Sequence, residues 1–283
     1  MKPRVLYVLG YGRSGSTVLG MALGAHPAMV NLGQISALRM FVPGPTYVGP
    51  RACGCRQPLD QCSYWRGVAQ RLGSMEALAR SDAGLSPTLG WRRYAPWLIQ
   101  PSAEMPRWAE AAAALYRATI EEAGASVAVD TSKGATRAWW LWKSGAVDLT
   151  FIWLTRRLDD VIRSQMKRGH SALKTVFSWQ LAQHQVGQFV RQVEATGARV
   201  PRITYERLTE APRTVLSEIL EHTGLPWHED VLTPRADHVI GGNPGAKREE
   251  RQTLEPAKAP RPPLPLQARL AMKLVSSRYA RMT

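Results

Sequence analysis

The sequence predicts a three-layer α/β domain in which a central parallel sheet is flanked by helices. Its 283 residues are enough to bury a large core without disulfides. Short apolar runs rich in β-branched residues alternate with longer amphipathic stretches, an order typical of parallel strands joined by crossover helices. The first apolar run leads directly into a glycine-rich turn, which predicts a ligand-binding loop at the end of the first strand.

The expected elements follow from local periodicity. Strands are expected where apolar and β-branched residues cluster, near residues 4–9, 127–130, 149–154 and 200–204. Helices are expected where apolar residues recur at helical spacing, over residues 15–25, 104–124, 158–169, 175–196 and 211–223.

The most informative segment is the loop after the first expected strand. Residues 10–17 read GYGRSGST and follow the apolar run Val5-Leu6-Tyr7-Val8. Backbone N–H groups at the start of a helix attract anions. The spacing nearly matches the P-loop, G-x-x-x-x-G-K-[ST], but Ser16 occupies the lysine position. We therefore expect a P-loop-like domain whose cation has moved to Arg13.

A second group of polar residues follows the strand expected at 149–154. Arg156 and Ser164 are eight residues apart, which places one at the strand end and the other two turns along the next helix. Arg168 lies four residues after Ser164, on the same face of that helix. Taken alone, this group is typical of a solvated basic helix end.

Both segments resemble those of the sulfotransferases that use 3′-phosphoadenosine-5′-phosphosulfate (PAPS). Bacterial, carbohydrate-type and tyrosylprotein-type members have a similar first loop, G-x-x-R-S-G-[ST]-[ST]-x-L in the bacterial and carbohydrate types. The likeness extends to further segments of the chain: Cys53-Gly-Cys55 with Cys62-Ser-Tyr-Trp65, Asp130-Thr-Ser-Lys133, Tyr205-Glu-Arg-Leu208 and Ile240-Gly-Gly-Asn-Pro244. In this family the last segment closes over the nucleotide.

The resemblance implies a role for individual residues. Those implied to bind PAPS are Gly12, Arg13, Ser14, Gly15, Ser16, Thr17, Arg156, Ser164, Arg168 and Tyr205, with Tyr205 near the adenine. Those implied for the transfer itself are Arg13, Lys133 and Gln34. A sulfuryl group carries one charge and needs a cation near the bridging oxygen, so no metal is expected.

The implied reaction is sulfuryl transfer from PAPS to a hydroxyl or amine of a small-molecule, lipid or glycan acceptor. Many relatives carry glutamate as the general base where this chain has Gln34, and an amide cannot accept a proton at neutral pH. The base therefore stays open, as does the identity of the acceptor. Two alternatives also stay open: a P-loop nucleotide-dependent kinase, and a catalytically inactive PAPS-binding protein.

Domain organisation is expected to be simple. Residues 1–245 form the sulfotransferase domain, with an insertion at about 66–103 on the acceptor side. Residues 246–283 form a proline-rich basic connector and a C-terminal helix that docks on the domain, or on an anionic membrane surface.

Charge and cysteine content limit the partners. The net charge is +15, but the basic residues are scattered and no nucleic-acid-binding motif is present, so no nucleic-acid partner is expected. No segment has the length of a membrane span, and we expect a cytoplasmic enzyme of undefined oligomeric state. Cys53, Cys55 and Cys62 do not form a disulfide framework, and no histidine near them in sequence supplies a fourth zinc ligand. No metal is expected there, and their redox state stays open.

Overall fold

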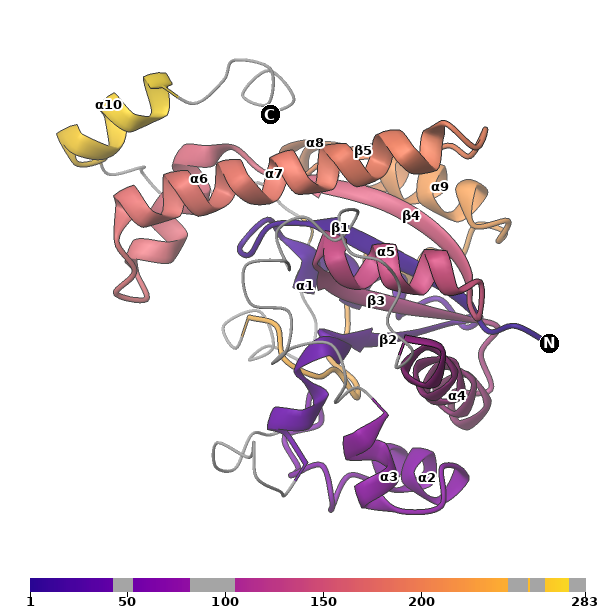
Figure 1. Cartoon of the computed structure of the whole chain (residues 1–283). Helices are drawn as coiled ribbons and strands as arrows, with labels where there is room; N and C mark the ends of the chain where they lie inside the picture. The colour runs from indigo at the N-terminus through magenta and orange to yellow at the C-terminus, as the bar shows by residue number, and fades with distance from the viewer. Residues whose placement is uncertain (43–52, 82–104, 244–253, 255–262, 275–283) are drawn as a thin grey trace.

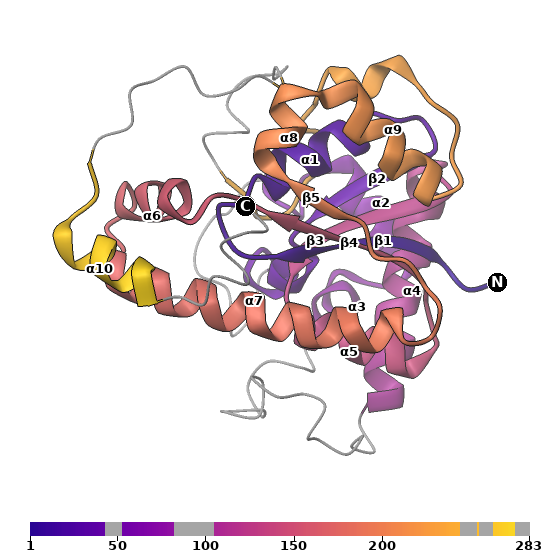
Figure 2. The same ribbon diagram turned by 90° about the horizontal axis from the view of Figure 1, so that it is seen from above.

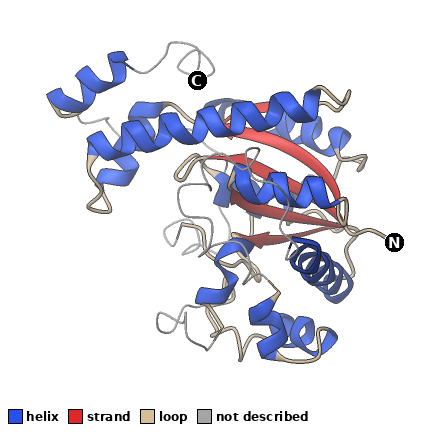
Figure 3. Ribbon diagram, viewed as in Figure 1, coloured by secondary structure: helices blue, strands red, loops and turns tan. Residues whose placement is uncertain are grey.

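The computed structural model describes residues 1–42, 53–81, 105–243, 254 and 263–274. In this part of the chain, five strands form one sheet: β1 (Arg4–Gly10), β2 (Met29–Gly33), β3 (Val127–Lys133), β4 (Asp148–Thr155) and β5 (Arg202–Thr204). Their order is β2-β3-β1-β4-β5, and every neighbouring pair is parallel. The predicted fold class is therefore confirmed (Figure 3).

Helices cover both faces of the sheet (Figure 2). The side chains of β1 alternate between the two faces. Tyr7 and Leu9 pack in a core with α4 (Met105–Ala123), α5 (Ala135–Ser144) and α7 (Ala172–Glu194). Leu6 and Val8 pack on the opposite face, in a core formed with the remaining sheet-covering helices, α1 (Ser16–Leu23), α8 (Tyr205–Glu210) and α9 (Pro212–His222).

The sequence predicted five of the helices to within a few residues, namely α1, α4, α6 (Leu158–Met166), α7 and α9. It missed strand β2, whose five residues Met29–Gly33 include Asn31 and a terminal glycine and lack a clear alternation. The parallel register with β3 stabilises this strand, and such pairing between distant segments leaves no local signal. It also missed α2 (Ser63–Arg71), α3 (Met75–Arg80), α5 and α8. Two 3₁₀ segments, Ile35–Met40 and Glu229–Leu232, complete the described elements before the C-terminal helix.

The two segments that depart from the α/β pattern lie at the edges of the domain. Residues 66–81 of the expected insertion include the end of α2 and all of α3, which pack in the same core as α4. Its aromatic part, Trp91 to Trp97, lies outside the described residues. Near the C-terminus, α10 (Leu266–Leu274) lies beside α7, with Leu264 and Ala271 buried in a cluster shared with α6 and α7 (Figure 1). Within the described residues, no helix combines the length and the apolar character needed to span a bilayer.

A buried polar network holds α4 and α5 to the middle of β3, at Asp130. The Tyr116 hydroxyl donates to Asp130 Oδ2 at 2.5 Å, and the Arg137 guanidinium donates to the Tyr116 hydroxyl at 3.2 Å. Asp130 also pairs with Arg137 at 3.5 Å and accepts from the Ser132 amide at 2.8 Å. Asp130 and Tyr116 are fully buried, so each needs the other to satisfy its hydrogen bonds.

We expect Tyr116→Phe to lower the free energy of unfolding by about 1–3 kcal/mol, because the buried Asp130 carboxylate loses a donor and water cannot replace it. Tyr11→Phe is the matched control, since the Tyr11 hydroxyl contacts Ser178 at an exposed position. Denaturant unfolding of both variants measures the difference. Equal losses for the two substitutions would contradict the role assigned to the buried network.

Candidate anion-binding site

A cavity of about 180 Å³ opens at the carboxyl end of the sheet. Parallel strands all end at this edge, so the loops that follow β1, β3 and β4 and the start of α8 after β5 meet there. The cavity is lined by Gly12, Arg13, Gly15, Ser16, Thr17, Val18, Gln34, Lys133, Arg156, Arg168, Tyr205, Gly242 and Asn243. Its lining in the described chain includes three arginines and one lysine but no carboxylate and no histidine.

The loop between β1 and α1 contains residues with positive φ, a backbone conformation that glycine adopts far more readily than other residues. Gly15 has φ +90° and precedes the first residue of α1, and a Cβ there would come within 2.1 Å of the Tyr205 ring. Arg13 also has positive φ, at 70°. Both features turn the loop tightly around the helix N-terminus, where backbone N–H groups favour an anion.

Two hydrogen bonds join this loop to the segment after β4. Arg13 Nε donates to Ser164 Oγ at 2.8 Å, and Arg156 Nη1 donates to the Arg13 carbonyl at 3.2 Å. The Arg156 guanidinium lies over the Tyr205 ring, 4.5 Å from its centroid. The loop, the arginine and the tyrosine thus form one packed unit on one wall of the cavity.

The positive charge of this wall is concentrated. Burial lowers the pKa of Arg13, and the nearby Arg168 and Arg156 lower it further. Two buried polar atoms here have no hydrogen-bond partner, Ser14 Oγ and Arg156 Nε. Buried cations and donors without acceptors are costly, so this arrangement fits an anionic ligand that would supply the acceptors.

Lys133 lies on another wall, at the end of β3. It has φ 70°, its side chain is buried, and its ammonium donates to the Thr131 carbonyl at 2.7 Å. Burial lowers its pKa to about 8, against a smaller opposite effect of Asp130. Its charge is therefore held in a place where an anion would stabilise it.

Gln34 is held by the segment that follows Val239. The backbone N–H of Gln34 donates to the Ile240 carbonyl at 2.8 Å. The side-chain oxygen of Gln34, Oε1, accepts from the backbone N–H of Gly242 at 3.3 Å. The Asn243 amide donates to Thr17 Oγ1 at 3.0 Å, which joins the same segment to the first loop. Gly242 has φ +81°, and a Cβ there would lie 2.9 Å from Thr17 Oγ1.

The structure brings together most of the residues that the sequence selected. Of these, Ser14 and Ser164 do not line the cavity, although Ser164 contacts Arg13. The cavity adds Val18, which the sequence did not select. It also contains Gly242 and Asn243, which belong to the segment that the resemblance implies closes over the nucleotide but were not named among the site residues. Gly241 and Gly242 both have positive φ, which glycine adopts without strain.

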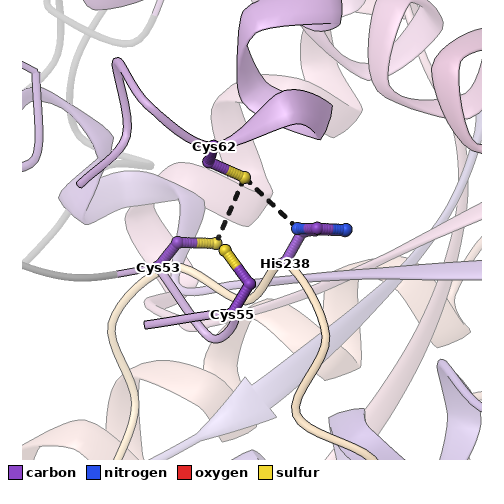
Figure 4. Close-up of side chains that lie close together, drawn as sticks. All are labelled: Cys53, Cys55, Cys62 and His238. Atoms are coloured by element: carbon purple, nitrogen blue, oxygen red, sulfur yellow. Dashed lines mark hydrogen bonds between the residues drawn. The ribbon is translucent and has the colours of Figure 1, made fainter. Parts of the chain in front are cut away.

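Sequence reasoning missed one residue of a second polar cluster. His238 lies beside Cys53, Cys55 and Cys62, although 176 residues separate it from Cys62 (Figure 4). Cys53 and Cys62 are buried, and all three thiols are free. The expectation of no metal depended on a missing fourth ligand, and the tertiary structure supplies one.

Two solved structures share the fold. The sulfotransferase domain from the Synechococcus PCC 7002 olefin synthase is 20% identical, with a TM-score of 0.53 over 96% of this chain and 94% of that chain. The sulfotransferase domain from the curacin biosynthetic pathway is 17% identical, with a TM-score of 0.52 over 97% of this chain and 98% of that chain. The chain matches no protein-family model and no curated protein sequence. At such identities the likeness concerns the fold, and function has to be argued from the site.

Lys133 should leave a signature in the pH dependence of stability. Its pKa falls from 10.5 to about 8 on folding, so between these values the unfolded chain binds more protons. Its contribution to the free energy of unfolding therefore rises with pH across this window. We therefore expect the free energy of unfolding of the wild type, minus that of Lys133→Met, to rise from about pH 8 to about pH 10.5. Denaturant unfolding over this pH range measures it. A difference that does not change with pH would show that the buried ammonium titrates as it does in water.

Proposed function

We propose that this protein is a sulfotransferase that transfers the sulfuryl group of PAPS to a hydroxyl or amine of a small-molecule, lipid or glycan acceptor. One observation carries the proposal: Arg13, Lys133, Arg156 and Arg168 line a cavity whose described walls contain no carboxylate. The fold shared with sulfotransferase domains is consistent with this reading.

The residues present fit a ligand with two anionic ends. The amides and hydroxyls of residues 14–17 would hold the 5′-phosphosulfate at the N-terminus of α1. Arg156, Ser164 and Arg168 would hold the 3′-phosphate, and the partnerless Nε of Arg156 is a donor for it. Tyr205, which packs against Gly15 and under Arg156, would contact the adenine.

PAPS supplies a sulfur that is already activated by its bond to the 5′-phosphate oxygen. In the transfer, a bond forms between the acceptor oxygen or nitrogen and sulfur, and the sulfur–oxygen bond to the phosphate breaks. Arg13 and Lys133 would stabilise the negative charge that appears on the departing oxygen. The Arg13–Ser164 hydrogen bond fixes the guanidinium before the ligand arrives, which reduces the entropy lost in reaching the reactive geometry.

Gln34 would orient the acceptor rather than take its proton, because a neutral amide is not a base at ordinary pH. Its Oε1 already accepts from Gly242, which leaves its amide N–H groups to donate to the acceptor. The described lining contains no carboxylate or imidazole, so in this proposal the acceptor's proton passes to water as the transfer proceeds.

The same site disfavours the kinase alternative. Kinase chemistry requires Mg²⁺ held by a carboxylate, and a P-loop lysine. Ser16 replaces that lysine, and the carboxylate in the middle of β3, Asp130, is fully buried and bonded to Tyr116 and Arg137. The inactive PAPS-binding alternative has the same cavity, and turnover of labelled PAPS in the presence of acceptors separates it from an enzyme.

We expect 3′-phosphoadenosine-5′-phosphate to raise the melting temperature of the protein without added Mg²⁺, because protein donors alone form both anion sites. ATP with Mg²⁺ should raise it less, since ATP has no 3′-phosphate for Arg156 and Ser164. Thermal unfolding over a series of nucleotide concentrations measures both. A larger shift with ATP and Mg²⁺ would favour the kinase.

Substitutions of two arginines should separate binding from chemistry. Arg156→Ala removes a charge-assisted contact, so nucleotide binding should weaken by about 1.5–3 kcal/mol in calorimetry. Arg13→Ala should lower kcat by a larger factor than it weakens binding, because its charge acts mainly in the transition state. Arg157→Ala is the matched control, since Arg157 is half-exposed, pairs with Asp159 and does not line the cavity. Arg13→Ala with normal kcat would remove Arg13 from the transfer step.

A further inference from the structure

Three cysteines from the segment before α2 lie close to one histidine from the segment before Ile240 (Figure 4). The sulfur atoms of Cys53, Cys55 and Cys62 and a ring nitrogen of His238 all lie within 4.8 Å of one another. Cys62 Sγ lies 3.8 Å from Cys53 Sγ and 3.2 Å from His238 Nδ1. None of the four lines the cationic cavity.

These separations approach those of a zinc coordination sphere. A tetrahedral zinc with Zn–S bonds of about 2.3 Å places its sulfurs about 3.8 Å apart, and sulfur and nitrogen about 3.5 Å apart. The Cys53–Cys62 separation matches the first value, and the Cys62–His238 separation is a few tenths of an ångström below the second. Small side-chain movements suffice to admit the ion.

The backbone holds the first two cysteines in a tight turn. The Cys53 amide donates to the Gln57 carbonyl at 2.8 Å, and the Arg56 amide donates to the Cys53 carbonyl at 2.9 Å. The Gly54 amide donates to the Val239 carbonyl at 3.1 Å, and a Cβ on Gly54 would lie 2.1 Å from the Asp237 carbonyl oxygen. Only glycine allows this turn to approach the histidine segment so closely.

The histidine is also oriented by its surroundings. Its ring stacks on Tyr64, with centroids 4.9 Å apart and planes 11° apart. Its carbonyl accepts from Trp65 Nε1 at 2.9 Å, and Trp65 is fully buried. Cys62, Tyr64 and Trp65 all lie at the start of α2. This short segment therefore supplies the Cys62 thiol and also holds His238 in place.

We propose that Cys53, Cys55, Cys62 and His238 form a structural zinc site. Three thiolates and one imidazole are a donor set typical of structural zinc, and four protein ligands leave no open position for catalysis. A disulfide would use only two of the cysteines. It would not account for the third thiol and the histidine, whose donor atoms also lie within 4.8 Å of the others in this cluster.

The position of the site suggests what the ion would do. His238 is followed by Val239 and Ile240, and the Ile240 amide and carbonyl bond Leu32 and Gln34 beside the sheet edge. Gly242 and Asn243 then contact Gln34 and Thr17 on the cavity wall. Zinc would therefore fasten both the start of α2 and the cavity-lining segment 239–243 to the domain.

The test is metal content of the purified full chain, after reconstitution with zinc under reducing conditions. We expect about one zinc per chain in wild type, and a cobalt-substituted chain with the intense visible absorption of tetrahedral thiolate coordination. His238→Ala should lose most of the zinc, whereas His238→Cys should retain it with four thiolates. His184→Ala removes an exposed histidine of α7 and is the matched control, expected to keep wild-type zinc.

A second measurement uses only the wild-type chain, so it does not depend on whether the variants fold. Hydrogen exchange of the wild-type chain, with zinc and after its removal by a chelator, should show faster exchange of the Gln34 and Ile240 amides without the metal. Neither readout depends on sulfuryl transfer. A reduced wild-type chain that binds no zinc, wild-type zinc content in His238→Ala, or exchange unchanged by the chelator would each overturn the proposal.

Discussion

The parallel pairing of β1 with both β3 and β4 is the constraint on which the rest of the structure depends. Because β1 lies between these strands, the glycine-rich loop, Lys133 and Arg156 all emerge at one edge of the sheet. The side chains of β1 alternate between two apolar cores, one beneath the helices on each face of the sheet. These two cores fix the pairing of β1 with β3 and β4. The site is thus positioned by the most buried part of the molecule.

Concentrated positive charge is a cost of this arrangement. Arg13, Arg156 and Arg168 lie close enough to lower the pKa of Arg13, and Lys133 is buried at the end of β3. Hydrogen bonds from Arg13 to Ser164 and from Arg156 to the Arg13 carbonyl hold the cations in place without neutralising them. An anionic ligand would relieve the repulsion, so ligand binding and stability are coupled at this edge.

Residues 236–243 connect two otherwise separate features. At one end, His238 contacts the cysteine turn and the start of α2. At the other, Gly242 and Asn243 form part of the cavity wall and bond Gln34 and Thr17. Glycines allow close contact at both ends, at Gly54 on the cysteine side and at Gly242 on the cavity side.

The sequence by itself determined the fold class, most of the long elements and most of the cavity-lining residues. Strand β1, the GYGRSGST loop and α1 are adjacent in sequence, and the Arg156–Ser164 spacing is set within one strand and helix, so local patterns report them. Tertiary structure alone decided which distant groups meet. The Arg13–Ser164 hydrogen bond, the pairing of β2, the Gln34–Gly242 contact and the placement of His238 beside three cysteines each join segments far apart in the chain. Such contacts depend on how the packed layers bring loops together, and neither periodicity nor spacing records that geometry.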